Sequence, residues 1–308
     1  MTPNSRIVIT GGTGFVGTAV CAQLSQAWPG ATLVVPTRQL GAARHIQSLP
    51  GVLPLRCNVH DPAQAAAVLQ GADALVHLVA ILHGSTAQFD AVHVQLPRTL
   101  AHAARQAGVG RVVHVSALGV SATAPSAYLR SKAGGEAVWA ASGLPLQLLR
   151  PSVIFGADDH FTNLFAQLQR VFPLLPLAGA DARFQPVAVG DVAQAVVAAL
   201  RPTLPDDPVV ECAGPEVLTL RQIVQQVGEM AGCARPVIGL PEAAGLLQAT
   251  LMGLMPGTPL MSRDNVLSMR VPNVATGQHP GLAALGILPQ ALASLAAHFA
   301  PRPAYRRW

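Results

Sequence analysis

The feature that most constrains the fold is a glycine-rich turn between a predicted strand and a predicted helix near the N-terminus. Residues 7–17 read Ile-Val-Ile-Thr-Gly-Gly-Thr-Gly-Phe-Val-Gly. The apolar β-branched start predicts a strand, and the apolar residues after the glycines recur at helical spacing. A strand, a tight turn and a helix in this order are the context in which such glycines bind a dinucleotide. The alternative is a glycine turn in an ordinary βα unit.

Each glycine of the motif has its own predicted role. Gly11 permits the tight turn, Gly14 leaves room for a pyrophosphate against bare backbone, and Gly17 lets the helix pack close to the strand. The helix N-terminus offers unpaired N–H groups and a partial positive charge to the phosphates. The residues expected to contact the cofactor here are Gly11, Thr13, Gly14, Phe15, Val16 and Gly17.

The composition fits a largely apolar globular chain with a basic surface. Its 308 residues suffice for one large or two modest domains, and 51% are hydrophobic. A net charge of +5 suits an anionic cofactor, an anionic membrane surface or a nucleic acid. Because no basic cluster has interleaved aromatic residues, we do not expect nucleic acid as a partner. The three arginines of residues 302–308 predict a solvated tail.

The cysteines and histidines predict neither disulfides nor a metal site. The four cysteines are far apart and form no C-x-x-C pair, and the ten histidines include no H-E-x-x-H motif. No signal peptide precedes the first strand, so we expect a cytoplasmic location, free thiols and no metal.

The end of the second predicted strand, residues 31–36, indicates which dinucleotide binds. An NAD site would place Asp or Glu there for the ribose 2′-hydroxyl. The chain has Pro36, Thr37 and Arg38 instead, and Arg44 follows. Guanidinium groups suit a 2′-phosphate, so NADP(H) is favoured over NAD(H). The alternative is a pair of surface arginines.

Alternating strands and helices over the first half predict the fold class and its ligand edge. They indicate a Rossmann-type doubly wound parallel sheet with a smaller C-terminal cap. Residues 1–155 would form the NADP-binding domain, with returning segments near 184–212, and residues 156–308 mostly the substrate cap. Ligands bind outside the carboxyl ends of such strands. Residues expected there, in addition to Arg38, are Asn58, Val59, Val79, Ala80, Ser116, Pro151 and Val153.

A Tyr-x-x-x-Lys pair supplies the candidate chemistry. Tyr128 and Lys132 are four residues apart on a predicted helix and therefore share one face. We expect the ammonium and the helix N-terminus to lower the pKa of the phenol, so that it can exchange a proton with a substrate oxygen. Ser116 would hydrogen-bond the same oxygen. The alternative is a chance pair, but Lys132 is the one lysine in a chain with 19 arginines.

Together these features resemble the short-chain dehydrogenase/reductase superfamily. The resemblance is closest to its atypical, NAD(P)-dependent epimerase/dehydratase-like branch, which includes the nucleotide-binding accessory subunit of respiratory complex I and its bacterial relatives. The stretches that carry it are residues 116–119 (Ser-Ala-Leu-Gly), 128–133 (Tyr-Leu-Arg-Ser-Lys-Ala), 150–156 (Arg-Pro-Ser-Val-Ile-Phe-Gly) and 184–192 (Phe-Gln-Pro-Val-Ala-Val-Gly-Asp-Val).

The resemblance implies roles for particular residues. Tyr128 would be the acid/base with Ser116 as its partner, and Lys132 would hold the nicotinamide ribose. Residues 151–154 would line the nicotinamide. Two positions depart from the pattern: Asn58 replaces an acidic residue that often meets adenine, and His93 replaces the helix-four Asn of a proton relay.

Two functions are therefore open. The first is an NADPH-binding oxidoreductase, or an epimerase or dehydratase that recycles its cofactor. The second is a catalytically weak or inactive NADPH-binding protein with a structural, assembly or redox-sensing role, of the complex I accessory-subunit type. The uncharged segment 243–262, with its helical part at 243–255, would be a buried or lid helix, or a surface for a protein partner or the inner membrane. A lipophilic substrate and a homodimer through helices four and five are further expectations.

Overall fold

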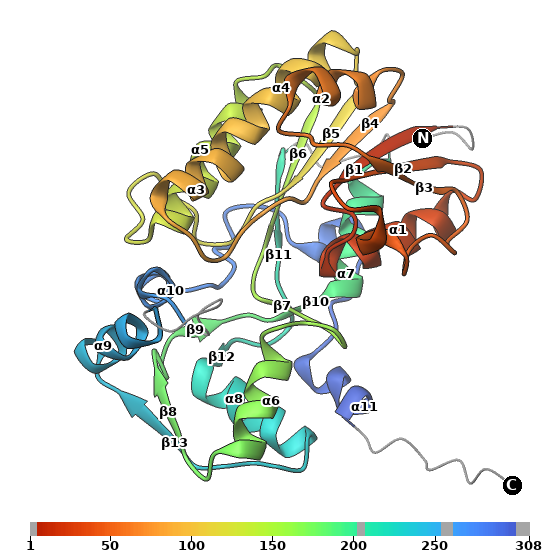
Figure 1. The fold of residues 1–308 in the computed structure, drawn as a ribbon. Helices are drawn as coiled ribbons and strands as arrows, with labels where there is room; N and C mark the ends of the chain where they lie inside the picture. The colour runs from red at the N-terminus through yellow and green to blue at the C-terminus, as the bar shows by residue number, and fades with distance from the viewer. Residues whose placement is uncertain (1–4, 202–206, 254–260, 300–308) are drawn as a thin grey trace, which may run out of the picture.

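The computed structural model of the chain describes residues 5–201, 207–253 and 261–299 (Figure 1). Two parts of the sequence predictions lie outside these residues. They are the arginine-rich tail at 302–308 and residues 254–260 of the uncharged segment, which include positions 254 and 255 of its predicted helix.

A seven-stranded parallel sheet forms the centre of the molecule, in the order β3-β2-β1-β4-β5-β6-β11. This confirms the predicted fold class, including the return of residues 209–212 to the sheet. The strand order reverses between β1 and β4, which makes the carboxyl ends of these two strands the switch point of the sheet. The strands are β1 (Arg6–Thr10), β2 (Thr32–Thr37), β3 (Val52–Arg56), β4 (Ala74–His77), β5 (Arg111–Val115), β6 (Leu146–Pro151) and β11 (Val209–Cys212).

Helices cover both faces of the sheet, so most strand residues are buried on both sides. One face packs against α1 (Phe15–Ala27) and α7 (Val189–Ala199). The other packs against α2 (Pro62–Leu69), α4 (Leu96–Gln106) and α5 (Ala127–Ala140). The short helices η1 (Leu40–Ala43) and α3 (Thr86–Asp90) lie in the connections after β2 and β4.

Most of the chain after β6 builds a smaller lobe beyond the carboxyl ends of the strands (Figure 1). Its helices α6 (Thr162–Val171) and α8 (Leu220–Met230) share an apolar core, which includes Ile223 and Val227. Three small strand pairs join it: β7 (Ile154–Phe155) with β10 (Val187–Ala188), β9 (Arg183–Phe184) with β12 (Leu218–Thr219), and β8 (Leu175–Ala178) with β13 (Val237–Leu240). The remaining elements are α9 (Glu242–Gly253), α10 (Arg263–Ser268), η3 (Leu282–Leu285), η4 (Leu292–Leu295) and α11 (Ala296–Phe299).

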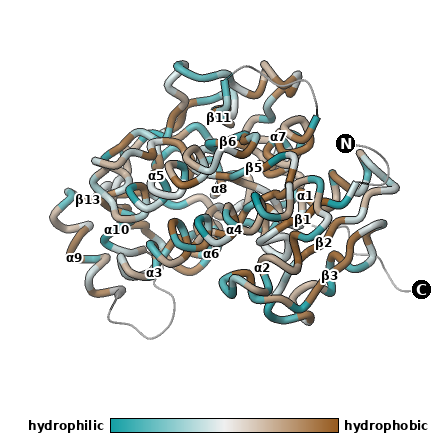
Figure 2. The backbone as a smooth tube through the Cα atoms, turned by 90° about the horizontal axis from the view of Figure 1, so that it is seen from above, coloured by the Kyte–Doolittle hydropathy of each residue, from teal (hydrophilic) through white to brown (hydrophobic). Residues whose placement is uncertain are grey.

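The predicted uncharged helix corresponds to α9 at the edge of the molecule. Both views place it at the periphery, where its tube is coloured largely apolar (Figures 1 and 2). Leu247 is 61% exposed and Leu251 58%, whereas Ala249 is buried against the lobe. None of the helices in the described ranges combines the length and the apolar character needed to cross a bilayer.

Candidate functional site

The glycine turn forms a backbone cradle at the N-terminus of α1, in which Gly11, Gly14 and Gly17 carry no side chains. Gly11 has a φ of 79°, which favours glycine, and the N–H of Gly14 donates to its carbonyl at 3.1 Å. A Cβ on Gly17 would lie 2.2 Å from the same carbonyl oxygen, so only glycine lets α1 approach the turn. The exposed Gly14 is the N-cap and supplies no side-chain cap, and the first turn has no acidic residue. The cradle therefore fits a pyrophosphate group.

The loop after β4 closes one side of this cradle. A Cβ on Gly11 would lie 3.1 Å from the backbone nitrogen of Val79. Ala80 follows and is exposed. Thr13 lies in the turn, and Phe15 and Val16 open α1. The structure thus brings the predicted phosphate residues and the β4 loop together at the switch point.

Residues at the ends of β2 and β3 form the adjacent end of the site. Arg38 follows β2 and is exposed, and the backbone N–H of Cys57 donates to the carbonyl of Thr37 at 2.9 Å. Asn58 accepts a bond from the N–H of His60 at 3.3 Å. Burial, and then the nearby charge of Arg38, lower the pKa of His60. Arg38, Asn58 and His60 are therefore neighbours, with Val59 between the last two.

Ser116 and Lys132 lie together at the end of β5. Ser116 is the first residue after the strand, and its buried hydroxyl oxygen has no hydrogen-bond partner within the described ranges. The Nζ of Lys132 donates to the carbonyl of Val115 at 2.8 Å. Burial lowers the pKa of Lys132 to about 8, with Glu136 opposing the shift. A bound ligand would supply the hydrogen-bond partner that the buried hydroxyl of Ser116 lacks.

Tyr128 differs from the sequence prediction of an acidified phenol. Burial raises the pKa of Tyr128 to about 12. The ammonium of Lys132 is engaged by a backbone carbonyl. The positive end of α5 faces the carboxylate of Asp264, which accepts from the N–H of Tyr128 at 2.9 Å. Burial thus outweighs both expected sources of acidification, and the phenol stays protonated at neutral pH.

The ring of His93 packs against the ring of Tyr128. It lies in a π-helical turn, η2 (Ala91–Gln95), between α3 and α4. The irregularity in this helix falls at η2, directly before Pro97, which has no N–H to donate to the carbonyl of His93 four residues earlier. The ring of His93 meets that of Tyr128 edge-on at 5.6 Å between centroids, and Phe89 stacks on His93 and also lies 6.0 Å from Tyr128.

The hydrogen bonds of His93 define its protonation state. Its Nε2 accepts from the backbone N–H of Ile81 at 3.1 Å, so the ring proton is on Nδ1 and donates to Ser131 at 2.8 Å. The Ser131 hydroxyl in turn donates to the carbonyl of Tyr128 at 2.7 Å. Burial, with the charge of Lys132, lowers the pKa of His93 to about 3. His93 is thus a neutral imidazole with both nitrogens engaged, not a carrier of protons.

Two further residues of the site come from the C-terminal lobe. The carboxylate of Asp264, on α10, also accepts from the N–H of Ala127 at 2.7 Å. The Oδ1 of Asn273 accepts from the hydroxyl of Ser152 at 2.7 Å and the N–H of Val153 at 2.9 Å, next to Pro151 at the end of β6. Sequence reasoning missed both, since neither belongs to a motif and each acts on residues more than 100 positions away.

The match to a family model agrees with this arrangement. The model described as the NAD dependent epimerase/dehydratase family matches residues 7–210 of the chain. These residues contain the glycine cradle, the Tyr128 and Lys132 pair, and all seven strands of the sheet except the first residue of β1 and the end of β11.

The individual proteins that are similar to this chain differ in their named functions. The mouse mitochondrial NADH dehydrogenase [ubiquinone] 1 alpha subcomplex subunit 9 is 30% identical over 298 residues, which cover 94% of this chain and 78% of the mouse protein. A ceramide reductase from Caulobacter vibrioides is 27% identical over 79% of this chain and 75% of its own length.

Among solved structures, an NADPH-dependent quinone oxidoreductase from Escherichia coli, complexed with NADPH, has a TM-score of 0.76 at 21% identity. The alignment covers 95% of this chain and 99% of that one. At this identity the likeness shows a shared fold.

Proposed function

The chain belongs to the NAD-dependent epimerase/dehydratase family, and from this premise we propose that it is an NADPH-dependent oxidoreductase of the short-chain dehydrogenase/reductase type. A bound nicotinamide cofactor would donate or accept a hydride at a carbonyl or carbinol carbon of the substrate. The observation that carries the proposal is the unsatisfied hydroxyl of Ser116 beside Lys132, on the strand-end edge that also holds the glycine cradle. An epimerase or dehydratase would use the same residues.

Tyr128 is the proposed proton donor. A phenol with a pKa of about 12 is protonated at neutral pH, so it can give its proton to a carbonyl oxygen that gains negative charge. The Ser116 hydroxyl would hydrogen-bond the same oxygen. Lys132 uses one N–H on the carbonyl of Val115 and keeps the others for ribose hydroxyls. The protonated phenol is the form that carbonyl reduction requires, because in that direction Tyr128 gives up its proton.

The preference for NADP(H) over NAD(H) rests on Arg38. It is exposed at the end of β2, no carboxylate stands at the neighbouring positions, and His60 lies close by. A guanidinium binds a phosphate strongly and a ribose hydroxyl weakly. The NADPH in the Escherichia coli fold neighbour is consistent with this assignment.

The substrate we propose is a lipophilic carbonyl compound or quinone. The lobe places at least one apolar side chain near the strand ends, since a Cβ on Gly119 would lie 3.1 Å from a methyl group of Val271. The names of two similar proteins, a ceramide reductase and a quinone oxidoreductase, also refer to lipophilic compounds. In this proposal residues 1–155, with segments near 184–212, hold the cofactor, and residues 156–308 supply most of the substrate cap.

A second function is favoured by His93. Because this imidazole is neutral and both its nitrogens are engaged, it provides no proton path to Lys132. A protein that holds NADPH without rapid turnover, in a structural, assembly or redox-sensing role, accommodates such a site. The similarity to the alpha subcomplex subunit 9 of NADH dehydrogenase supports this candidate. The exposed side chains of Leu247 and Leu251 would then serve a protein partner or the inner membrane. A cytoplasmic location and a homodimer stay predictions.

Turnover separates the two functions. NADPH oxidation is followed with a panel of lipophilic ketones and quinones, for the wild type and for Tyr128→Phe, with Tyr305→Phe as the matched control. The oxidoreductase proposal expects kcat to fall at least ~100-fold in Tyr128→Phe at unchanged NADPH affinity, and to stay constant in Tyr305→Phe. Tight NADPH binding without turnover on any compound would favour the second function.

A further inference from the structure

The side-chain amide of Asn273, a residue of the C-terminal lobe, joins two strand-end connections of the central sheet. Its Oδ1 accepts from the N–H of Val153 at 2.9 Å and from the hydroxyl of Ser152 at 2.7 Å, between β6 and β7. Its Nδ2 donates to the carbonyl of Leu118 at 3.4 Å, in the loop after β5. The backbone N–H and carbonyl partners identify which atom of the amide is oxygen. Asn273 therefore uses both halves of its amide to bridge the two connections.

The backbone of Asn273 is held from the side of the lobe. Its N–H donates to the carbonyl of Arg183 at 2.9 Å, and its carbonyl accepts from the N–H of Gln185 at 3.0 Å. These two bonds form a parallel bridge beside β9. Because both of its backbone polar groups are engaged, Asn273 presents its amide to the strand ends from a fixed support.

The bend between β6 and β7 is the part of the sheet edge that Asn273 holds. Ser152 and Val153 alone separate the two strands. The N–H of Ser152 donates to the carbonyl of Cys212 in β11, and the carbonyl of Val153 accepts from the N–H of Val187 in β10, each at 3.0 Å. Asn273 supplies the acceptor for the N–H of Val153. Strand pairing thus holds the two ends of the bend, and Asn273 holds its middle.

We propose that Asn273 is a positioning residue for the nicotinamide half of the cofactor. This rests on the proposed function, in which residues 151–154 line the nicotinamide. Asn273 acts through the backbone of that segment and is not assigned a contact with the cofactor itself. A wall that is already fixed needs less ordering when the ligand binds, which raises the affinity. Through Asn273 the C-terminal lobe sets the affinity of the sheet edge for the nicotinamide half.

The adenine half of the cofactor gives the proposal its selectivity. In the proposed function this half is held by Arg38 and Asn58, at the ends of β2 and β3. β6 is separated from β2 by β5, β4 and β1, and four strand spacings amount to ~19 Å. Loss of the Asn273 amide should therefore weaken binding of the nicotinamide half and leave binding of the adenine half unchanged.

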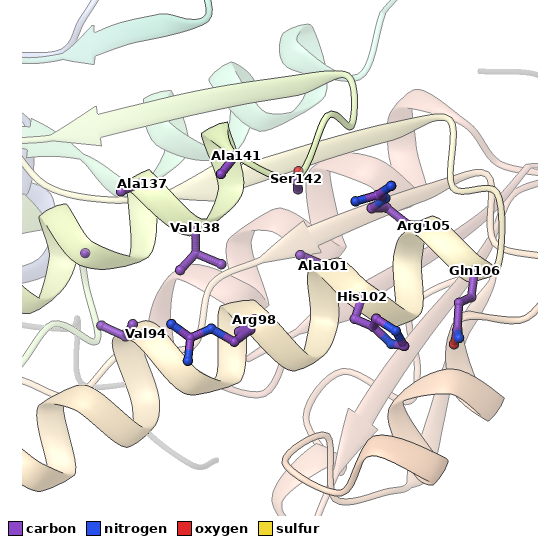
Figure 3. Close-up of a pocket in the computed structure, with 11 residues that line it drawn as sticks. Val94, Arg98, Ala101, His102, Arg105, Gln106, Ala137, Val138, Ala141 and Ser142 are labelled. Atoms are coloured by element: carbon purple, nitrogen blue, oxygen red, sulfur yellow. The ribbon is translucent and has the colours of Figure 1, made fainter.

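The predicted homodimer face is separate from these contacts. A groove of about 890 Å³ runs along the outer side of α4 and α5, the two helices through which we expect the dimer (Figure 3). Its described lining residues belong to the stretches 94–106 and 134–142, so Asn273, Ser152 and Leu118 are not among them. Formation or loss of a dimer at this face would therefore leave the bridge of Asn273 in place.

Nucleotide binding tests the proposal. NADPH and adenosine 2′,5′-bisphosphate, which lacks the nicotinamide half, are titrated by calorimetry into the wild type, Asn273→Ala and Asn273→Asp. We expect Asn273→Ala to bind NADPH at least ~10-fold more weakly and the bisphosphate within ~2-fold of the wild type. Asn273→Asp keeps the acceptor for Ser152 and Val153, so its NADPH affinity should stay within ~3-fold of the wild type.

Gln147→Ala is the matched control. Gln147 is a buried amide near the amino end of β6, and its Nε2 donates to the carbonyl of Pro208 at 2.8 Å. This variant should leave both affinities unchanged. Equal losses of both nucleotides in Asn273→Ala, or no loss of NADPH, would overturn the inference and leave the proposed function intact. A wild type that binds neither nucleotide would overturn the proposed function and the inference with it.

Amide hydrogen exchange tests the positioning without any nucleotide. Followed by NMR, the N–H of Val153 should be protected in the wild type, in Asn273→Asp and in Gln147→Ala. It should exchange at least ~10-fold faster in Asn273→Ala, because its acceptor is gone. An equally protected Val153 amide in Asn273→Ala would overturn the inference, since the bend would then be held without the lobe.

Discussion

The carboxylate of Asp264 accepts a hydrogen bond of 2.9 Å from the backbone N–H of Tyr128. Its second oxygen accepts from Ala127 at 2.7 Å, while the hydroxyl of Ser126 caps Leu129. The first turn of α5 is therefore capped by its own N-cap residue and by a residue 136 positions away. Through this contact the C-terminal lobe holds the helix that carries the candidate acid/base.

Removing this cap should destabilise the protein. We expect Asp264→Ala to lower the free energy of unfolding by about 1 kcal/mol, because two N–H groups of α5 lose their acceptor. Urea denaturation measures the change. The control is Asp158→Ala, which removes an exposed carboxylate in the loop before α6. Its free energy of unfolding should stay within ~0.5 kcal/mol of the wild-type value. An Asp264→Ala protein as stable as the control would show that the contact contributes nothing.

Gly17 should tolerate no side chain. A Cβ there would lie 2.2 Å from the carbonyl oxygen of Gly11, so Gly17→Ala must displace α1 from the phosphate cradle. We expect NADPH affinity to fall at least ~10-fold, which corresponds to ~1.4 kcal/mol of binding free energy. Gly41→Ala is the matched control, since a Cβ at Gly41 meets no atom within 4 Å. Unchanged NADPH binding in Gly17→Ala would contradict the assignment of the cradle.

Much of the fold and part of the site could be predicted from the sequence. The glycine turn, the strand ends and the Tyr128 and Lys132 pair each lie within a short stretch of sequence. Their residue types and spacing can therefore be recognised without the structure. The acidity of Tyr128 was predicted wrongly because burial raises its pKa, and that burial comes from packing against residues far along the chain, such as Phe89 and His93. The sequence signals the π turn at His93 only through Pro97, which cannot donate to the carbonyl four residues before it.

Buried histidines should make stability depend on pH. Burial, helped by Lys132, lowers the pKa of both His77 and His93 to about 3. In the unfolded chain each would take up a proton near pH 6.5. The unfolded state therefore binds more protons below that pH, and stability present above pH 6.5 is lost as the pH falls toward 3.

Urea denaturation measured between pH 7 and 5 isolates the contribution of the histidines, because most carboxylates titrate at lower pH. Each such histidine adds up to ~1.4 kcal/mol per pH unit to the slope. We expect His93→Asn to flatten the slope and the exposed-site variant His102→Asn to leave it as in the wild type. Equal slopes for all three proteins would mean that His93 is not held neutral.

Lys132 can be titrated alone, because it is the single lysine of the chain. With lysine labelled at Cε, NMR should give one side-chain signal that titrates near pH 8, since burial lowers the pKa of this ammonium to about 8. Glu136 opposes the shift, so Glu136→Gln should move the midpoint to lower pH. A midpoint near the ordinary value of 10.5 would place the ammonium in solvent and contradict the buried site.

We propose that the strand-end edge holds NADPH through the glycine cradle and Arg38. The most direct measurement releases and identifies any nucleotide from the purified protein, then titrates NADPH and NADH by fluorescence. We predict NADPH to bind at least ~10-fold tighter than NADH, and this ratio to fall close to one in Arg38→Ala but not in Arg170→Ala. Equal affinity for the two nucleotides, or binding of neither, would contradict the account.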